Sequence, residues 1–370
     1  MNDPVVITGL GVLSPLGIGA QETVAAWREG VPALAPATRF DAPAGSSPLC
    51  GEVPEFRVEE YVPSAKAYLD RNSALLLAAC GLARRDAALP LPDPAPERIG
   101  ILAGTAWSGQ DSMAAFFADY AQKGPRLVKP FLFPHTYANT AVSLAALEWS
   151  LRGAHQGFSA GRVSAGHAIV EACDLLREDA AGALLAGGAE ALGPALFGHL
   201  AALGLLKPAE GAGTADGIDP AEAGAMLVLE RRGRARERGA TERAVVLGAG
   251  LGSAPVAAIR QALAEAGVAA GDLAAVIASA NGQPAVDRAE AEALRETIGL
   301  PLPPVIAPAR LCGDTLGACA ALQTALAALA LSDPGAVPAV LLRPGPILIL
   351  ATDPSGSSVA LVLAGGEGEG

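Results

Sequence analysis

Aromatic and charged residues are scarce in this chain of 370 residues. Phe, Trp and Tyr make up 4% of the sequence and the charged types 17%, whereas hydrophobic residues make up 51%. The core must therefore be built from Ala, Val, Leu and Ile. Because the net charge is −12, the chain lacks the positive surface that nucleic-acid binding needs, and no nucleic-acid partner is expected.

Cysteine and histidine are also few. The five cysteines are an odd number with no metal-binding spacing, and the four histidines form no close pair. This pattern argues against a disulfide framework or a metal site, and the sequence implies no cofactor. Cys173, Cys312 and Cys319 are interpreted as small core residues, and His167 as a structural one.

Long apolar runs are absent apart from one. Residues 316–331 are Ala-rich, but the run is short for a membrane span and contains Gln323 and Thr324, so it is predicted to be a buried helix. The opening MNDPVVITGLG carries an acidic residue and leads directly into an apolar segment, so no signal peptide is expected. We therefore expect a cytoplasmic protein with no membrane partner.

Short apolar runs alternate with Ala-rich stretches along the chain. Several runs are apolar throughout, as strands covered on both faces are, and the alternation predicts an α/β fold with helices packed on central sheets. The predicted strands are Val5–Ile7, Ile99–Leu102, Leu184–Ala186, Met226–Leu229, Val245–Leu247, Val276–Ala278, Val305–Ala307, Ile347–Leu350 and Val359–Leu363. The predicted helices are residues 66–87, 137–151, 166–177, 255–267, 287–298 and 315–332.

A charged segment interrupts this pattern. Residues 230–239 read ERRGRARERG and are flanked by predicted strands. We place the boundary between two halves of the chain here, which gives the ranges 1–238 and 239–370. The segment itself is interpreted as a solvated surface helix or loop, with a binding patch as the alternative.

Motifs spread over nearly the whole chain carry a family resemblance. They are VVITGLGVLSPLG at 5–17, GPR at 124–126, PF at 130–131, LRG at 151–153, AGGAE at 186–190 and GAMLVLE at 224–230. Together, and in this order, they resemble the β-ketoacyl synthase family of the thiolase superfamily. The resemblance implies a thiolase-like fold of two pseudo-equivalent halves in a five-layered αβαβα arrangement, and a dimer built through the sheet edges.

The position of the family nucleophile is altered. Family condensing enzymes use a cysteine thiolate at the start of a helix, assisted by two histidines and a lysine. The family motif T-A-C-x-S-G-x-H-x-I corresponds to AGRVSAGHAI at 160–169 here. The motifs at 151–153 and 167–169 fix the register and place Arg162 in the position of the cysteine. A guanidinium cannot act as a nucleophile.

The other reacting positions differ as well. The family motif A-H-G-T-x-T-P reads ASANGQP here, so Ser279 replaces the first histidine. The motif K-S-M-T-G-H reads ARLCGD, so Ala309 replaces the lysine and Asp314 the second histidine. Residues 353–358 stand where the family has a glycine-rich loop with a gating phenylalanine. Because all four positions are changed, the resemblance implies that the condensation chemistry is lost.

A ketosynthase-like chain without these groups is similar to the chain length factors of type II polyketide synthases. That likeness implies a heterodimer with an active ketosynthase, a role in shaping the acyl or polyketide elongation tunnel, and contact with acyl carrier protein mainly through the ketosynthase. Aromatic-polyketide members usually carry glutamine at the cysteine position, so we hypothesise a highly reducing system that makes polyenes. The alternatives are a thioester decarboxylase or acyl hydrolase acting through Ser164 or Ser279, and a homodimeric acyl-binding protein.

Arg162 and Asp314 are predicted to interact. A cation at a helix start opposes the helix dipole at a cost of about 0.3–1 kcal/mol, so Arg162 needs a partner. We hypothesise that the two residues form a buried ion pair that fills the lost site; the alternative is that Asp314 caps the helix that follows it. Asp287 and Glu290 are interpreted as a capping box at a helix start.

One further segment has a helical pattern of large side chains. Met113, Phe116, Phe117 and Tyr120 are spaced i, i+3, i+4, i+7 and so share one face of a predicted helix over 111–122. The pattern alone fits an ordinary core helix. In the family this region lies at the subunit interface near the acyl tunnel, so the resemblance implies that these side chains limit the length of the growing chain.

Overall fold

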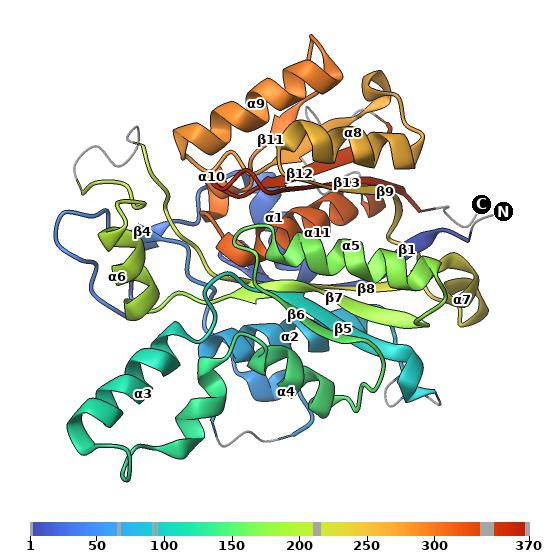
Figure 1. The fold of residues 1–370 in the computed structure, drawn as a ribbon. Coiled ribbons are helices and arrows are strands. Elements are labelled where there is room, and N and C mark those ends of the chain that lie inside the picture. Colours follow the sequence, from blue (N-terminus) through green and yellow to red (C-terminus); the bar gives the residue numbers. More distant parts are fainter. Residues whose placement is uncertain are drawn as a thin grey trace.

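Strands and helices alternate in layers through the whole molecule. The structure is a computed structural model that describes residues 3–64, 68–90, 93, 95–209, 216–333 and 344–366. Two strand layers are separated by a central helical layer and covered on both outer faces by further helices (Figure 1). This arrangement confirms the predicted α/β, five-layered αβαβα fold class.

The two strand layers repeat the same topology. In the first, the order β1-β8-β7-β5-β6 begins with antiparallel pairs and ends with the parallel pairs β7–β5 and β5–β6. In the second, the order β9-β13-β12-β10-β11 has the same sequence of antiparallel and parallel pairs. The strands are β1 (Val5–Ser14), β5 (Ile99–Gly104), β6 (His155–Phe158), β7 (Ala183–Glu190), β8 (Ala223–Arg231), β9 (Ala244–Gly252), β10 (Ala275–Ala278), β11 (Val305–Ile306), β12 (Ile347–Thr352) and β13 (Ser358–Gly365).

The two layers are joined along one short stretch. Val5 to Ile7 of β1 pair antiparallel with Ala244 to Val246 of β9, and β2 (Gly17–Ile18) adds to the end of β1. A separate small sheet pairs β3 (Ala35–Pro36) with β4 (Leu49–Cys50). The pseudo-equivalent halves therefore share a continuous core rather than packing as two independent units.

The central helical layer contains α5 (Ser164–Arg177) and α11 (Cys319–Ser332), which pack against each other and against both strand layers. Every residue of α11 from Cys319 to Ala330 is buried, which confirms the prediction of a buried Ala-rich helix. Within the described residues, no helix is long and apolar enough to span a membrane.

Helices also cover the two outer faces. Helix α2 (Arg71–Asp86) packs on β1 and β8 of the first strand layer, with α4 (Thr140–Glu148) beside it. On the other side, α8 (Pro255–Ala266) and α9 (Pro284–Ile298) cover the second layer (Figure 1). The close approach of α2 depends on glycine, because a Cβ at Gly9 or Gly11 would collide with the backbone of α2.

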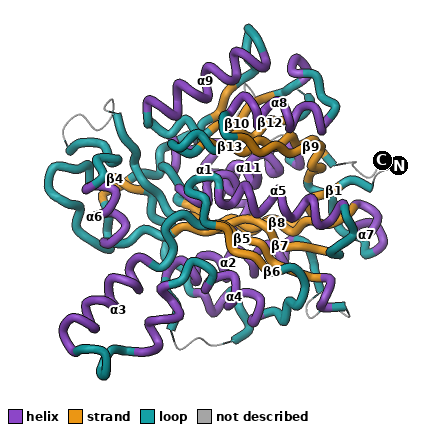
Figure 2. Tube along the Cα trace, in the orientation of Figure 1, coloured by secondary structure: helices purple, strands orange, loops and turns teal. Residues whose placement is uncertain are grey.

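Several elements lie outside these layers. Helix α3 (Gln110–Lys123) projects from the body, as Figure 2 shows, and the 3-10 segment η3 (Pro130–Thr136) packs beside it. The start of α3 contacts the small lobe that holds α6 (Pro194–Ala202), where Ala195 N donates to Asp111 Oδ1 at 3.0 Å. The remaining elements are α1 (Gly19–Glu29), α7 (Arg232–Glu237), α10 (Ala309–Cys312), η1 (Val58–Glu60), η2 (Pro96–Arg98), η4 (Ala270–Asp272) and η5 (Leu316–Ala318).

The charged segment 230–239 is only partly a solvated surface element. It contains the end of β8 and the short helix α7, but Glu230 is buried and accepts hydrogen bonds from Thr8 Oγ1 at 2.7 Å and Arg238 Nη2 at 2.6 Å. Arg232 pairs with Glu242 at 2.6 Å across the predicted boundary. The segment is thus joined to the first half by the Glu230–Thr8 hydrogen bond and to the second half by the Arg232–Glu242 ion pair. Thr8 and Arg238 supply the polar and charged partners that the buried Glu230 carboxylate needs.

Candidate functional site

Arg162 lies in a tight turn between β6 and α5. Gly161 has a φ of +62°, and Ser164, the first residue of α5, holds the turn together. Its Oγ donates to Gly161 O at 2.6 Å and accepts from Ala160 N at 2.8 Å. The turn directs the Arg162 side chain inward, where it is 4% exposed.

The predicted ion pair is present. Arg162 Nη2 contacts Asp314 Oδ2, and both side chains are buried. Asn281 Nδ2 donates to the same carboxylate oxygen at 3.0 Å, and Leu316 N donates to Asp314 Oδ1 at 3.0 Å. Asp314 therefore pairs with Arg162 and accepts from the first residue of η5, but it is not the N-cap of α11, which is Ala318. Burial lowers the pKa of Arg162 from its ordinary value, and the surrounding carboxylates oppose that shift.

Ser279, Asp287 and Glu290 belong to the part of the site that the second half of the chain supplies. Ser279, at the end of β10, is buried and accepts a hydrogen bond from Thr352 N at 3.2 Å. Burial raises the pKa of Glu290 to about 7 and also raises the pKa of Asp287. These carboxylates accept from the preceding loop, at Ala280 N (3.1 Å) and Gly282 N (3.3 Å) respectively.

The interpretation of Asp287 and Glu290 as a capping box was wrong. Helix α9 begins at Pro284 with Gln283 as its N-cap residue, so both acidic residues lie inside the helix. Proline is favoured in the first turn of a helix because its missing N–H has no partner there in any case. The two carboxylates instead accept hydrogen bonds from backbone N–H groups of the loop before the helix and so hold that loop in place.

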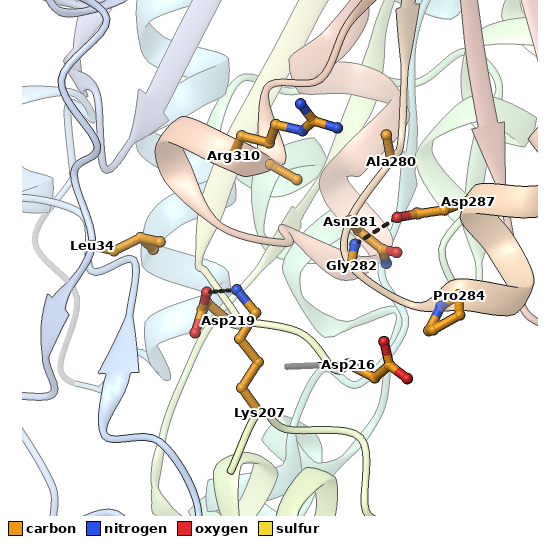
Figure 3. A pocket seen from close by; sticks show the side chains of 11 residues that line it. Leu34, Lys207, Asp216, Asp219, Ala280, Asn281, Gly282, Pro284, Asp287 and Arg310 are labelled. Atoms are coloured by element: carbon orange, nitrogen blue, oxygen red, sulfur yellow. Dashed lines mark hydrogen bonds and ion pairs between the residues drawn. The ribbon is translucent and has the colours of Figure 1, made fainter. Parts of the chain in front are cut away.

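A polar cavity of about 530 Å³ opens beside this loop (Figure 3). Ala309, where the family has a lysine, lies in its wall together with Arg310. Lys207 and Asp219 form an ion pair of 2.6 Å on another wall. The cavity reaches Asn281, whose side chain donates to Asp314, but neither Asp314 nor Arg162 is among its lining residues.

A second cavity, of about 280 Å³, borders Arg162 directly. Its wall is mostly apolar and includes Trp107, Leu200, Leu205 and Leu316, with Asp353 beside Arg162. The position that motif register aligns with the family nucleophile therefore borders an apolar cavity.

The described cysteines and histidines do not assemble into a reactive pair. All five cysteines are buried, and burial raises the pKa of Cys173, Cys312 and Cys319 to about 12. No histidine lines either cavity in the described part of the chain. The ring of His167 instead stacks on Phe158 with a centroid separation of 6.3 Å. These residues fit the structural roles predicted for them.

The predicted helix over 111–122 is α3, and its large side chains are not part of the core. Phe117 is 58% exposed and Tyr120 is 46% exposed, while Met113 and Phe116 are half-buried. The Phe116 ring contacts the rings of Phe117 and Phe133, each at a centroid distance of 5.7 Å. The ordinary-core interpretation of this helix is therefore wrong.

Sequence reasoning missed part of this aromatic surface and one residue of the buried site. We call the segment 110–137 the aromatic arm; its exposed apolar side chains are Phe117, Tyr120, Leu127, Phe131, Phe133 and Tyr137. The cluster of aromatic residues after position 130 was a usable signal for it. Asp353, whose carboxylate reaches Arg162 N, gave no signal beyond its position in the altered loop 353–358.

Family comparisons match both halves of the chain. The family described as Beta-ketoacyl synthase, N-terminal domain, matches residues 2–235, and Beta-ketoacyl synthase, C-terminal domain, matches residues 232–342. The chain belongs to the β-ketoacyl synthase family.

Its relatives include both a synthase and a beta subunit. The tetracenomycin polyketide synthase ketoacyl synthase beta subunit of Streptomyces glaucescens is 34% identical over 361 residues, which cover 89% of this chain and 86% of the relative. The 3-oxoacyl-(acyl-carrier-protein) synthase 2 of Staphylococcus aureus is 27% identical over 368 residues, which cover 92% of this chain and 88% of the relative. Membership of the family alone therefore does not decide between a catalytic and a non-catalytic role.

Solved structures confirm the thiolase-like fold. The ishigamide ketosynthase/chain length factor matches with a TM-score of 0.89 at 24% identity, covering 99% of this chain and 100% of that chain. The ketosynthase ApeO in complex with its chain length factor ApeC from Xenorhabdus doucetiae matches with a TM-score of 0.80 at 20% identity, covering 98% of each chain.

Proposed function

We propose that this chain is a non-catalytic chain length factor that pairs with an active ketosynthase and forms part of the wall of the elongation tunnel. The buried Arg162–Asp314 ion pair carries this proposal. It occupies the start of α5, where the family places its nucleophile, with a cation that cannot attack a thioester. The 34% identity to a ketoacyl synthase beta subunit supports the same role.

Neither candidate serine combines a histidine partner with access to a cavity. The Ser164 hydroxyl donates to Gly161 O and accepts from Ala160 N, so its proton is already used in a hydrogen bond within the turn. Ser279 is buried, Thr352 N donates to its oxygen, and its hydroxyl also interacts with the Glu290 carboxyl. A serine nucleophile requires a general base and space for its substrate; no described histidine contacts either hydroxyl, and Ser279 lines neither of the two cavities. This counts against the alternative of a thioester decarboxylase or acyl hydrolase.

The aromatic arm and the strand β6 support a protein partner. Six large apolar side chains of the arm are exposed together, which is unusual for a monomeric surface. Strand β6 is the last strand of its layer, and His155, Gln156 and Gly157 are exposed along it. A ketosynthase that pairs with β6 and covers the arm would bury both. In a solved structure that shares this fold, the ketosynthase ApeO is in complex with its chain length factor ApeC.

Contact with acyl carrier protein is assigned mainly to the partner. Carrier proteins are typically acidic, and this chain has a net charge of −12. Repulsion between two acidic surfaces slows their association, so the ketosynthase is expected to supply the basic docking patch. Mixing the carrier with either subunit alone and with the complex tests this assignment.

The arm is also proposed to limit product length. Met113 and Phe116 are the half-buried members of the α3 face, and Phe116 is held in place by Phe133. Truncating either side chain leaves space that a longer acyl chain can fill. We expect Met113→Ala and Phe116→Ala to shift the products of the complex to longer chains.

The test is co-expression with an active type II polyketide ketosynthase subunit. A stable heterodimer on size-exclusion chromatography and mass spectrometry of the acyl products are the two measurements. Leu300→Ala is the matched control, because Leu300 is 77% exposed and lies in the second half of the chain, outside the arm. Unchanged product length in both arm variants would contradict the tunnel role, and absence of a complex would contradict the pairing.

The homodimer alternative and the type of pathway need separate measurements. A homodimeric acyl-binding protein would form a stable dimer alone and ignore the ketosynthase, whereas a chain length factor needs its partner. For the pathway we propose a highly reducing system that makes polyenes, because Arg162 departs from the glutamine of the aromatic-polyketide members. Long-wavelength absorption of the product from conjugated double bonds is expected; an aromatic product would contradict this assignment.

A further inference from the structure

Asp353 connects the second half of the chain to the start of α5. It lies in the loop between β12 and β13, and its Oδ2 accepts a hydrogen bond from Arg162 N at 3.0 Å. Its Oδ1 accepts from Ser355 N at 2.9 Å and from Ser355 Oγ at 2.7 Å. The loop closes on itself through Asp353 N to Ser357 O at 2.8 Å and Gly356 N to Asp353 O at 2.8 Å.

The carboxylate of Asp353 is held in its charged form. Burial alone would raise its pKa, but the hydrogen bonds from Ser355 and Arg162 outweigh burial and lower the pKa below its usual value. The positive end of the α5 dipole favours an anion at the same place. The start of α5 thus already holds an anion, and that anion belongs to the chain itself.

The backbone N–H of residue 162 has a defined role if a nucleophile stands there. When a nucleophile at a helix start attacks an acyl group, its own N–H commonly donates to the oxyanion that forms. We infer that Asp353 occupies this oxyanion position, so that the chain stays closed to acyl transfer even when a thiol is restored at position 162. This inference rests on the proposed loss of catalysis and adds a second, independent block to it.

Gly161 supports the inference. An added Cβ at Gly161 would collide with Asp353 Oδ2, and the positive φ already disfavours other residues. The family motif has alanine at this position. Alanine could not coexist with the Asp353 carboxylate where it now lies, so Gly161 and Asp353 are fitted to each other.

Lack of room is not what excludes an acyl group. The apolar cavity of about 280 Å³ borders both Arg162 and Asp353, and its wall includes Leu200 and Leu205. An acyl tail has space there, but its carbonyl oxygen would meet a carboxylate instead of a free N–H donor. Removing the Asp353 carboxylate should therefore uncover an anion site next to an existing apolar cavity.

The first test uses the full chain with Arg162→Cys and Asp314→Asn, which removes both members of the buried pair. Position 162 borders the apolar cavity and no cysteine lines that cavity, so the introduced thiol is the one that a reagent in the cavity reaches. Three versions are compared: Asp353 retained, Asp353→Asn and Asp353→Ala. Alkylation by iodoacetamide reports the thiolate alone, and acylation by hexanoyl-N-acetylcysteamine, followed by intact mass, also needs the oxyanion donor.

The ratio of acylation to alkylation rates decides the outcome. Because one oxyanion donor is worth about 10²–10³ in rate, the ratio should rise by about tenfold or more in Asp353→Ala. It should stay low in Asp353→Asn, whose side-chain oxygen still accepts from the N–H of residue 162. Equal ratios in the three versions would overturn the inference. The proposed pairing and tunnel role would be unaffected, since neither partner nor product enters this test.

A second test keeps the native Arg162, so it does not depend on folding of the multiple variants. Asp353→Ala should speed hydrogen exchange of the peptide that contains residue 162 by about tenfold or more, because its amide loses its acceptor. Sodium acetate should restore protection and sodium chloride should not. The control Ser355→Ala, which keeps the Asp353 carboxylate, should retain protection. Unchanged exchange in Asp353→Ala, or faster exchange that acetate does not slow, would overturn the inference.

Discussion

Removing one charge from the Arg162–Asp314 pair should destabilise the protein strongly. Asp314→Asn keeps the size of the side chain and an oxygen that can accept from Leu316 N, but it leaves a guanidinium that is 4% exposed without its partner. Breaking a buried ion pair in this way costs about 3–5 kcal/mol. The lower end is expected here, because Asp353 and other carboxylates near Arg162 still attract its charge.

A double-mutant cycle measures the interaction energy between Arg162 and Asp314 apart from the interactions that each residue makes with its surroundings. Arg162→Met removes the cation and keeps most of the apolar stem, and the double variant contains no buried charge at either position. Replacing both members of a buried pair is often close to neutral, so the double variant should be more stable than Asp314→Asn alone. The coupling energy from the cycle should be about 2–4 kcal/mol.

Thermal unfolding is the assay, measured on the heterodimer and on any chain that can be purified alone. An unfolding entropy of roughly 2.1 cal/mol/K per residue gives about 0.8 kcal/mol/K for 370 residues. A loss of 3–5 kcal/mol then lowers Tm by about 4–6 °C if the chain unfolds cooperatively. If the double variant melts at the temperature that the two single shifts predict by addition, the reasoning about the pair is refuted.

Three further predictions follow from buried groups. Glu290 has a folded pKa of about 7 against an ordinary value of 4.5, so its contribution to stability is lost as pH rises from about 4.5 to 7. Over this range the Tm of the native chain should therefore fall relative to the Tm of Glu290→Gln. If the difference between the two Tm values does not change with pH, the assignment of this pKa is contradicted. Iodoacetamide should label none of the five native cysteines until urea unfolds the chain, and fast labelling of the folded protein would show an exposed thiolate. Gly11→Ala should cost about 1–3 kcal/mol or more in urea unfolding, because its Cβ would enter the backbone of α2; an unchanged midpoint would show that α2 can move away.

The sequence allowed the fold to be predicted where side chains on both faces of an element are apolar. Strands such as β5 and β12 are buried throughout, so their runs of Ile and Leu stand out. Strand β6 was missed because His155 to Gly157 are polar or small and exposed; this segment is a strand because it pairs with β5. The start of α9 was misplaced by three residues because Pro284 was not taken as the first helical residue.

The site was predictable at positions that motif register fixes, and not beyond them. Arg162, Ser279 and Asp314 follow from anchors on both sides of each motif, and charge chemistry then led to the ion pair. The contact between Asp353 and Arg162 joins residues 191 positions apart, and no local pattern encodes it. The exposure of Phe117 and Tyr120 was likewise out of reach, because their helical spacing fits a core face equally well.

The pseudo-symmetry of the fold has a consequence for assembly. The counterpart of β6 in the second half is β11, which has two residues, Val305 and Ile306, and follows directly after Pro303 and Pro304. Prolines and short length blunt a strand against further pairing, so a second chain can extend the molecule at β6 but not at β11. In the proposed heterodimer, β6 is therefore the edge at which the partner strand would add, and β11 leaves no comparable edge for a third chain.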